Sequence, residues 1–235
     1  MDTQTFKETR IFKDTHMLKD TRLFKDIGPE DIDSLLNCLG AYARTYKKGE
    51  VIYAAARPVT AMGLVLSGKV RIEQTDVWGN QNIFGYAGPG QVFAESYACA
   101  PKETMMVDVT AVSDCQILFL NVHKILTTCP SACAFHSRLI ANLLTVMATK
   151  NMSLSRKIND ISHRSIRERL LSYLSYQAMK SGSNTFDIPF NRQELADYLC
   201  VDRSALSKEL GKMKKDGLLT WQKNHFHVYD TFLQE

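Results

Sequence analysis

Residues 191–216 constrain the fold of this chain more than any other stretch, because they predict two short helices joined by a tight turn. Asn191 can cap the first helix, and Glu194 stands three residues later, where the partner of a capping box belongs. Asp202 can cap the second helix, in which apolar residues recur at helical spacing: Ala205, Leu206, Leu210 and Met213. The segment therefore predicts a helical pair with one buried face.

The outward face of the second helix carries short polar and cationic side chains: Arg203, Ser204, Ser207 and Lys208. A helix that shows such side chains from its first two turns can enter the major groove of DNA. The alternative is an ordinary helical pair with a solvent-exposed face. Residues 218–221 and 225–229 predict two strands after the pair, so this part of the chain predicts a winged helix.

A longer helix is predicted upstream, beginning near Ser131 and continuing for about thirty residues. Within it, residues recur at alternating intervals of four and three: Ile140, Leu144, Met147, Asn151, Leu154, Ile158 and Ile161. This heptad spacing predicts the seam of a parallel dimer, where Asn151 would fix the register at some loss of stability. A second stripe (Leu139, Leu143, Val146) predicts packing on the preceding domain. The alternative is a helix buried within one monomer.

Short β-type runs fill the region between residues 44 and 121, at 51–53, 63–72, 83–86, 107–112 and 116–120. Turn residues such as Lys48-Gly49 and Gly88-Pro89-Gly90 separate them. Many short strands at this spacing predict a double-sheet barrel or jelly roll. The expected fold class is α+β: an N-terminal double-stranded β-helix, a long dimerisation helix and a C-terminal winged helix-turn-helix.

The N-terminal residues 5–27 repeat a six-residue pattern, and the last copy leads into a predicted helix that begins at Pro29. We expect the folded part to begin near Leu23, with residues 1–22 as an extension. The barrel is then expected over 23–130, the dimerisation helix over 131–161 and the winged helix-turn-helix over 162–235. Ser165 and Glu168 form a possible capping box, which predicts a hinge near 162–165.

Composition excludes several classes of protein. The net charge of +4 permits a polyanionic partner without requiring one. We expect no membrane association and a cytoplasmic location, because apolar runs are too short for a membrane span and the N-terminus is too charged for a secretory signal. The six cysteines are scattered without a CxxC pair, which argues against zinc-ribbon and thioredoxin-like sites and predicts free thiols.

The order of barrel, long helix, hinge and winged helix resembles the CRP/FNR family of bacterial transcription regulators. The motifs that carry the likeness are residues 191–196 with 203–210, 167–170, 66–70 and 88–95. The resemblance implies a homodimer on two-fold symmetric double-stranded DNA, with RNA polymerase as a candidate partner. It places base reading on Arg203, Ser204, Ser207 and Lys208, and a backbone contact on Arg192. Three lysines that follow, Lys212, Lys214 and Lys215, are expected to meet phosphates. Many members carry Glu at the position of Ser204 and Arg at that of Lys208, so the family's usual half-sites are not assumed.

The same resemblance implies an effector site in the barrel, where Glu95 matches the carboxylate that holds a ribose in cyclic-nucleotide-binding members. Ala94 replaces the glycine of that motif, and residues 72–137 contain no arginine to neutralise a phosphate. We therefore expect an unidentified small-molecule effector other than cyclic AMP, with candidate contacts at Glu95, Ser96, Met105 and Met106. No cofactor or metal site is assigned, and residues 1–37 lack the cysteines of the family's iron–sulfur branch.

Three alternatives remain for the function. A regulator of this fold can be independent of any effector. It can respond to thiol oxidation, with Cys129 and Cys133 four residues apart and Cys38 or Cys115 as partners, although buried spectator thiols are the simpler explanation. A cupin-like enzyme would need clustered His and carboxylate ligands, whereas His123 stands alone after the last predicted strand, so we expect no enzyme.

Overall fold

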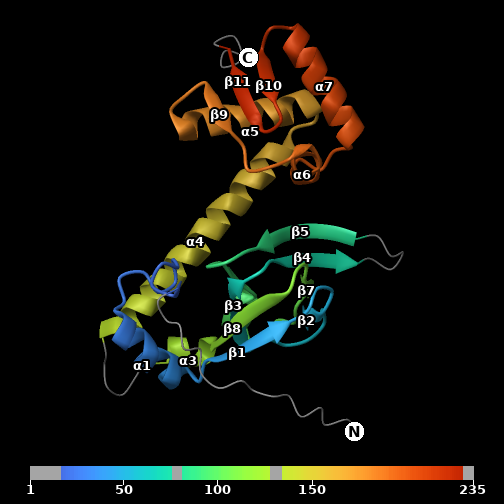
Figure 1. Cartoon of the computed structure of the whole chain (residues 1–235). Coiled ribbons are helices and arrows are strands. Elements are labelled where there is room, and N and C mark those ends of the chain that lie inside the picture. Colours follow the sequence, from blue (N-terminus) through green and yellow to red (C-terminus); the bar gives the residue numbers. More distant parts are fainter. Residues whose placement is uncertain (1–16, 76–80, 128–133, 230–235) are drawn as a thin grey trace. The chain divides into compact units, whose positions relative to one another are not determined.

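The structure is a computed structural model that describes residues 17–75, 81–127 and 134–229. The chain divides into two compact units, Met1–Thr149 and Lys150–Glu235 (Figure 1). The division falls inside the long helix α4 (Ala134–Ser162). The presence of α4 confirms the long helix that the sequence predicts, over the residues that the structure describes. The first thirteen residues of the second unit, 150–162, are therefore the end of α4, about three and a half helical turns.

The first unit contains two four-stranded antiparallel sheets. One sheet has the order β1-β8-β3-β6, formed by Tyr42–Tyr46, Cys115–Asn121, Ala61–Ser67 and Val92–Phe93. The other has the order β2-β7-β4-β5, formed by Val51–Tyr53, Asp108–Ala111, Val70–Thr75 and Gln81–Ala87. Both sheets contribute to one hydrophobic core, as the predicted jelly roll requires.

A contact at strand β3 holds the two sheets together around this core. Gly63 lies opposite Phe93 in the β3–β6 pair, and the Phe93 ring covers the Gly63 backbone. A Cβ at Gly63 would lie 2.1 Å from Cζ of that ring. Phe93 is fully buried and stands in edge contact with Tyr53 of the second sheet, so the ring joins the two layers.

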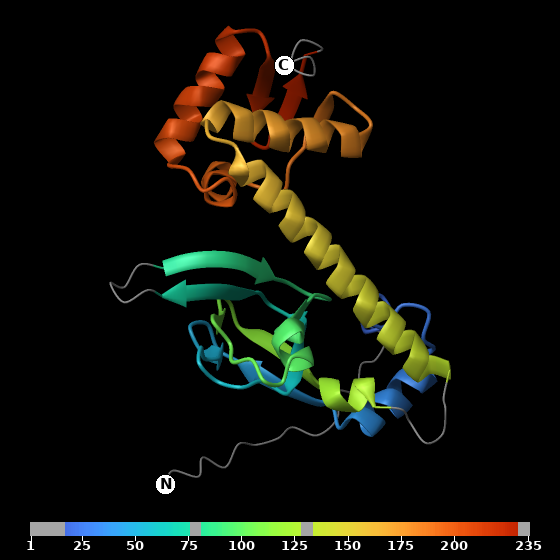
Figure 2. The same ribbon diagram turned by 180° about the vertical axis from the view of Figure 1, so that it is seen from behind.

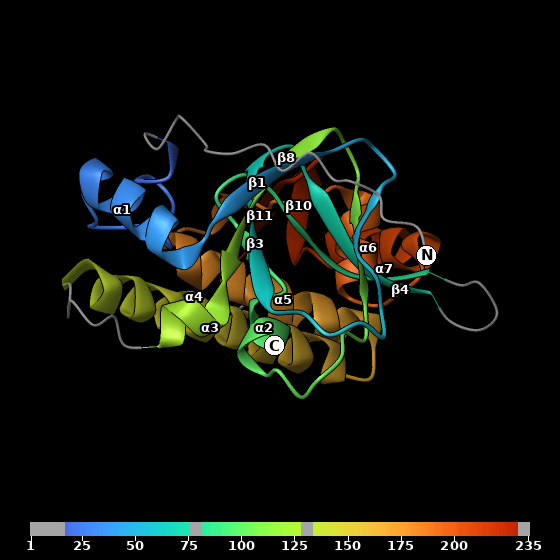
Figure 3. The same ribbon diagram turned by 90° about the horizontal axis from the view of Figure 1, so that it is seen from below.

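Helices close the first unit at one end. These are α1 (Pro29–Leu39), α3 (Val122–Leu126) and the first turns of α4, which lie together in two views (Figures 1 and 3), with the short α2 (Glu95–Cys99) following β6. Helix α1 begins at Pro29 and ends at Gly40 in the left-handed conformation, as the sequence predicts. The second stripe of α4 is buried in this core, which confirms its predicted packing: Leu139, Leu143 and Val146. Among the residues described, no helix combines the length and apolar character that crossing a membrane would need.

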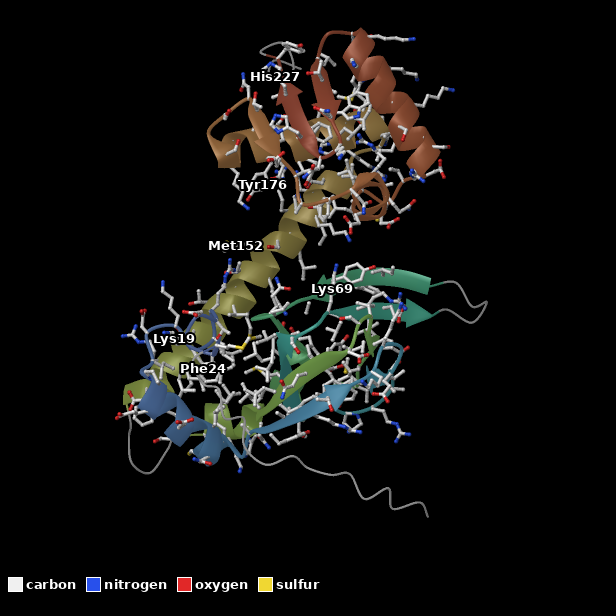
Figure 4. The ribbon with its side chains drawn as sticks, in the orientation of Figure 1. Lys19, Phe24, Lys69, Met152, Tyr176 and His227 are labelled. Atoms are coloured by element: carbon white, nitrogen blue, oxygen red, sulfur yellow. The ribbon has the colours of Figure 1, made fainter. Side chains whose placement is uncertain are left out.

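The packed core begins earlier in the chain than the expected start at Leu23. Leu18 is fully buried, and so are Leu23 and Phe24. Figure 4 labels Phe24, beside the first turns of α4. Asn142 of α4 holds this segment by donating from Nδ2 to the carbonyl oxygens of Leu23 (3.0 Å) and Lys25 (2.8 Å). The third copy of the repeat is thus part of the fold, while its first two copies lie outside the described residues.

The second unit is a winged helix (Figure 2). It contains α5 (Ile166–Ser181), α6 (Arg192–Tyr198), α7 (Arg203–Lys215) and a sheet of order β10-β11-β9, formed by Leu219–Gln222, His225–Val228 and Thr185–Asp187. The predicted capping box at the start of α5 is present, since Ser165 accepts from Glu168 N and the Glu168 carboxylate accepts from Ser165 N. The core joins α5, α7 and the sheet through Leu170, Leu174, Leu206, Leu210 and Phe226.

Candidate nucleic-acid interface

Helix α6 begins with the capping box that the sequence predicts. The Asn191 side chain accepts from the backbone N–H groups of Gln193 (2.9 Å) and Glu194 (3.0 Å), and the Glu194 carboxylate accepts from Asn191 N at 2.8 Å. These bonds satisfy backbone donors that a helix start otherwise leaves open. Leu195 and Ala196 are fully buried in the core of the second unit. The first helix of the pair is therefore fixed by this packing and by the capping box at its start.

Arg169 of α5 fixes the turn between the two helices. Its guanidinium donates from Nη1 to the carbonyl oxygens of Leu199 (2.9 Å) and Cys200 (3.2 Å), and from Nε to the carbonyl of His163 (2.9 Å). Cys200 has a left-handed backbone with φ of 53°, and its carbonyl needs a donor from outside the helix. Sequence reasoning missed this role of Arg169, because the contact spans about thirty residues of chain.

Helix α7 starts at the predicted cap and buries the predicted face. Asp202 accepts from Ala205 N (2.9 Å) and from Ser204 Oγ (2.5 Å), and these two hydrogen bonds hold the pKa of the Asp202 carboxyl below its usual range. Leu206, Leu210 and Met213 are fully buried, whereas Ala205, the fourth residue of the predicted face, is partly buried. The structure brings four candidate base readers to the exposed face of the first two turns: Arg203, Ser204, Ser207 and Lys208.

The two serines of this face already use their hydroxyl hydrogens within the helix. Ser204 donates to Asp202, and Ser207 donates to the carbonyl of Arg203 at 2.9 Å. Each oxygen keeps lone pairs that can accept a hydrogen bond. In this arrangement the serines offer acceptors to a groove, whereas Arg203 and Lys208 offer only donors.

Arg167 anchors the flank of α7 on α5. Its Nε donates to Glu209 Oε1 at 2.9 Å, and its Nη2 donates to Asp216. The pKa of the Glu209 carboxyl is lowered, first by the hydrogen bond from Arg167. Lys212 approaches the same carboxylate at 3.3 Å, so the structure places this predicted DNA contact beside the anchor, on a flank of the helix.

Arg192, the other predicted backbone contact, lies against the wing. Its guanidinium carbon stands 5.4 Å from the centroid of the Trp221 ring and 5.7 Å from that of Phe226. Burial lowers the pKa of Arg192, because loss of water disfavours the charged form of the guanidinium. The Lys214 ammonium lies 5.7 Å from the centroid of the same Trp221 ring, so Trp221 joins the start of α6 to the end of α7.

The predicted seam of α4 is largely open to solvent in the single chain. Leu154 is 59% exposed and Ile158 63% exposed, and Leu144 and Asn151 are also exposed. Ile140 and Met147 are partly buried against the core of the first unit, and Ile161 is partly buried. Large apolar side chains at heptad spacing are therefore left without cover within one protomer.

The candidate effector residues do not share one environment. Glu95 is 5% exposed at the start of α2, with Ser96 Oγ 3.5 Å from its Oε1. Met105 is buried, whereas Met106 is 68% exposed. Ala94 has a left-handed backbone with φ of 59°, which glycine adopts more easily, so the residue that departs from the family motif occupies a strained position.

Thiol and metal chemistry would each need a particular arrangement of side chains. The described residues include the free thiols Cys38, Cys99, Cys115 and Cys200, while Cys129 and Cys133 lie outside them. Within the part of the chain that the structure describes, no group of three or more His, Cys, Asp or Glu side chains is placed to hold a metal ion.

Comparisons with known proteins agree with this architecture. The model of the cyclic nucleotide-binding domain matches residues 43–131, and that of the Crp-like helix-turn-helix domain matches residues 168–231. The transcriptional activator protein FnrL of Cereibacter sphaeroides is 23% identical over 203 residues, which cover 80% of this chain and 77% of that protein. The cyclic AMP receptor protein of Thermus thermophilus is 25% identical over 194 residues, covering 82% and 85%.

A solved structure of CprK in complex with OCPA has a TM-score of 0.67 at 16% identity, covering 88% of this chain and 94% of that one. This similarity shows that the two chains have the same fold. The two domain models together span more than half of the chain, and its relatives are transcription regulators. The chain belongs to the CRP/FNR family of transcription regulators, in which a DNA-binding helix-turn-helix domain accompanies an effector-binding domain.

Proposed function

We propose that this regulator acts as a homodimer on a two-fold symmetric operator, with α7 of each protomer in one of two successive major grooves. The single observation that supports it best is the exposed heptad stripe of α4, on the same chain as an exposed polar face of α7. Half-sites would lie about 34 Å apart, one turn of the duplex. A DNA partner implies a cytoplasmic site of action, and RNA polymerase stays a candidate partner.

The proposal is tested by selecting duplexes from a random-sequence pool with the wild-type chain and measuring their affinity in a gel shift. We expect a selected sequence with two inverted half-sites, bound with a steep dependence on salt concentration, since phosphate contacts release counterions. Selection of a single, unrepeated half-site, or a flat salt dependence, would contradict the proposal.

Arg203→Ala is expected to reduce affinity for the selected operator by about 30-fold or more, because each of the two half-sites loses a base contact that contributes about 1–3 kcal/mol of discrimination. Affinity for random DNA should change little. The matched change Lys212→Ala removes a cation from the flank of α7 and should weaken both duplexes equally. Equal losses on both duplexes for Arg203→Ala would assign Arg203 to the phosphate backbone instead.

Asn151→Leu is expected to keep or raise the stability of the dimer and to weaken control of its register. A buried asparagine lowers the stability of a coiled coil, but it pairs best with its own copy. Analytical ultracentrifugation against urea measures the first effect, and cysteine cross-linking at an adjacent α4 position measures the second. A dimer that dissociates on this substitution would contradict the placement of Asn151 in the seam.

We infer that the effector is a small molecule other than cyclic AMP. The Thermus relative is named a cyclic AMP receptor, but residues 72–137 of this chain supply no arginine for a phosphate. Thiol oxidation is less favoured at two positions, because burial raises the pKa of both Cys99 and Cys115 and so lowers their thiolate content.

A thermal-shift screen with metabolite fractions separates the alternatives for control. Stabilisation by one fraction, lost on its removal, supports a small-molecule effector. An effector-independent regulator would bind its operator with the same affinity in every fraction, and a thiol-responsive one would change affinity only with oxidant.

A further inference from the structure

Asp160 is a fully buried charge in the last turn of α4, and none of the DNA contacts proposed above uses it. Its Oδ1 accepts from Arg156 Nη2 at 2.7 Å and from Ser172 Oγ at 2.7 Å. Its Oδ2 accepts from the Tyr198 hydroxyl at 3.1 Å. We call these four residues, Arg156, Asp160, Ser172 and Tyr198, the Asp160 cluster.

The Asp160 cluster joins three helices of the second unit: the end of α4, the middle of α5 and the end of α6. Arg156 strengthens the link to α5, because its Nη2 also donates to Ser172 Oγ at 2.9 Å and its guanidinium lies over the Tyr176 ring at 4.5 Å (Figure 4). The Tyr198 ring packs against both Tyr173 and Phe190, with centroids 5.2 and 5.1 Å away, and these two rings also contact each other at 6.1 Å.

Such a cluster fixes the relative orientation of the helices more than it stabilises their packing. A buried ion pair loses hydration that its attraction only partly restores, so apolar side chains of similar size could hold the helices about as firmly. Charge-assisted hydrogen bonds, however, are short and directional, and they permit few arrangements of the helices that carry them. A carboxylate bonded to three helices therefore limits the angles between them.

The corner that was expected to be a hinge lies within this bonded region. Residues 163–165 separate α4 from α5, but Asp160 and Ser172 are bonded across them, and Arg169 is bonded to His163. The compact second unit begins at Lys150, so the seam residues Leu154 and Ile158 belong to the same unit as α6 and α7.

We propose that Asp160 is a positioning residue for DNA recognition, and that its cluster sets the orientation of α6 and α7 relative to the dimer seam on α4. This inference rests on the proposed dimeric function. In such a dimer, each α7 is placed relative to the two-fold axis by its own α4, so the Asp160 cluster determines which spacing of half-sites the dimer accepts.

The test uses the full chain and the selected operator, together with duplexes in which one base pair is inserted or removed at the centre. Each such change rotates one half-site by about 34° and moves it by about 3.4 Å. Wild type should lose affinity steeply on both altered duplexes. Asp160→Asn keeps the side-chain size and removes the charge, so we expect about tenfold weaker binding at the preferred spacing and a nearly flat dependence on spacing.

Tyr198→Phe is the second variant, because it removes only the hydroxyl that links α6 and leaves the ring packing in place. It should flatten the spacing dependence in the same direction and carries the test if Asp160→Asn does not fold. Asp187→Asn is the matched control, since it neutralises an exposed carboxylate of β9 that pairs with His225 at 2.8 Å. The control should keep the wild-type profile.

Binding to a duplex with one half-site separates positioning from loss of fold. Both cluster variants should bind it as tightly as wild type. A wild-type spacing profile in both variants would overturn the inference, and so would equal losses on one-half-site and two-half-site duplexes. A wild-type protein that shows no preference for two half-sites would instead refute the proposed dimeric function.

Discussion

Leu154→Lys combined with Ile158→Lys is expected to convert the protein to a monomer and to lower its affinity for the selected operator by at least about 100-fold. Four apolar side chains leave water when two seams meet, and each contributes about 1.5–3 kcal/mol. Lysines facing their own copies would lose that burial and repel one another. A monomer binds each half-site separately and loses the gain of a linked second contact, which is commonly 100-fold or more.

The fold of each protomer should survive this change, because both residues are already more than half exposed in the single chain. Met152→Lys with Met179→Lys is the matched control, since it adds the same charge at two exposed apolar positions outside the seam. Sedimentation equilibrium gives the mass and a gel shift gives the affinity. A double-lysine variant that remains a dimer would show that the interface lies elsewhere.

Gly68→Ala is expected to destabilise the first unit by about 3 kcal/mol. Gly68 joins β3 to β4 with φ of +81°, a conformation that costs an L-residue about 1–2 kcal/mol. A Cβ there would also lie 2.4 Å from the Asp114 carbonyl oxygen and 2.8 Å from Cys115 Cα, and backbone atoms cannot swing away as a side-chain end can. Overpacking of this kind adds about 1–3 kcal/mol.

Differential scanning calorimetry measures this effect, and we expect one transition to fall by about 10 °C while the transition of the second unit stays in place. Gly49→Ala isolates the backbone contribution, because Gly49 also has positive φ (+90°) but no atom within 4 Å of an added Cβ. Gly88→Ala has neither penalty and should be neutral or slightly stabilising. Equal shifts for Gly68→Ala and Gly49→Ala would mean that the contact with residues 114–115 relaxes.

Much of the candidate DNA interface could be predicted from the sequence, because the features that define it depend on residues close to one another in the chain. The caps at Ser165, Asn191 and Asp202 act on backbone groups two or three residues away. The buried face of α7 follows from the spacing of Leu206, Leu210 and Met213 within one helix. A pattern that depends on neighbours within one or two turns keeps its meaning whatever the rest of the chain does.

Two short strands, β6 and β9, were not predicted, because their signals are not local. Strand β6 has two residues and β9 has three, too few for alternation to be visible. Each exists because a longer strand pairs with it: β3 pairs with β6, and β11 pairs with β9. Leu18 was likewise assigned to an extension, since nothing in a charged six-residue repeat shows that this leucine is buried in the core of the first unit.

The sequence by itself therefore determined where the main helices begin, which faces they bury and which cationic and hydroxyl groups α7 displays. Only the tertiary structure decided how those groups are held. Arg169 bonds a turn about thirty residues away, Arg167 bonds α7 across 42 residues, and Asp160 bonds Tyr198 across 38. Polar side chains such as these look alike on a solvated surface and in a buried network, and the difference lies in partners that only folding brings within hydrogen-bond distance.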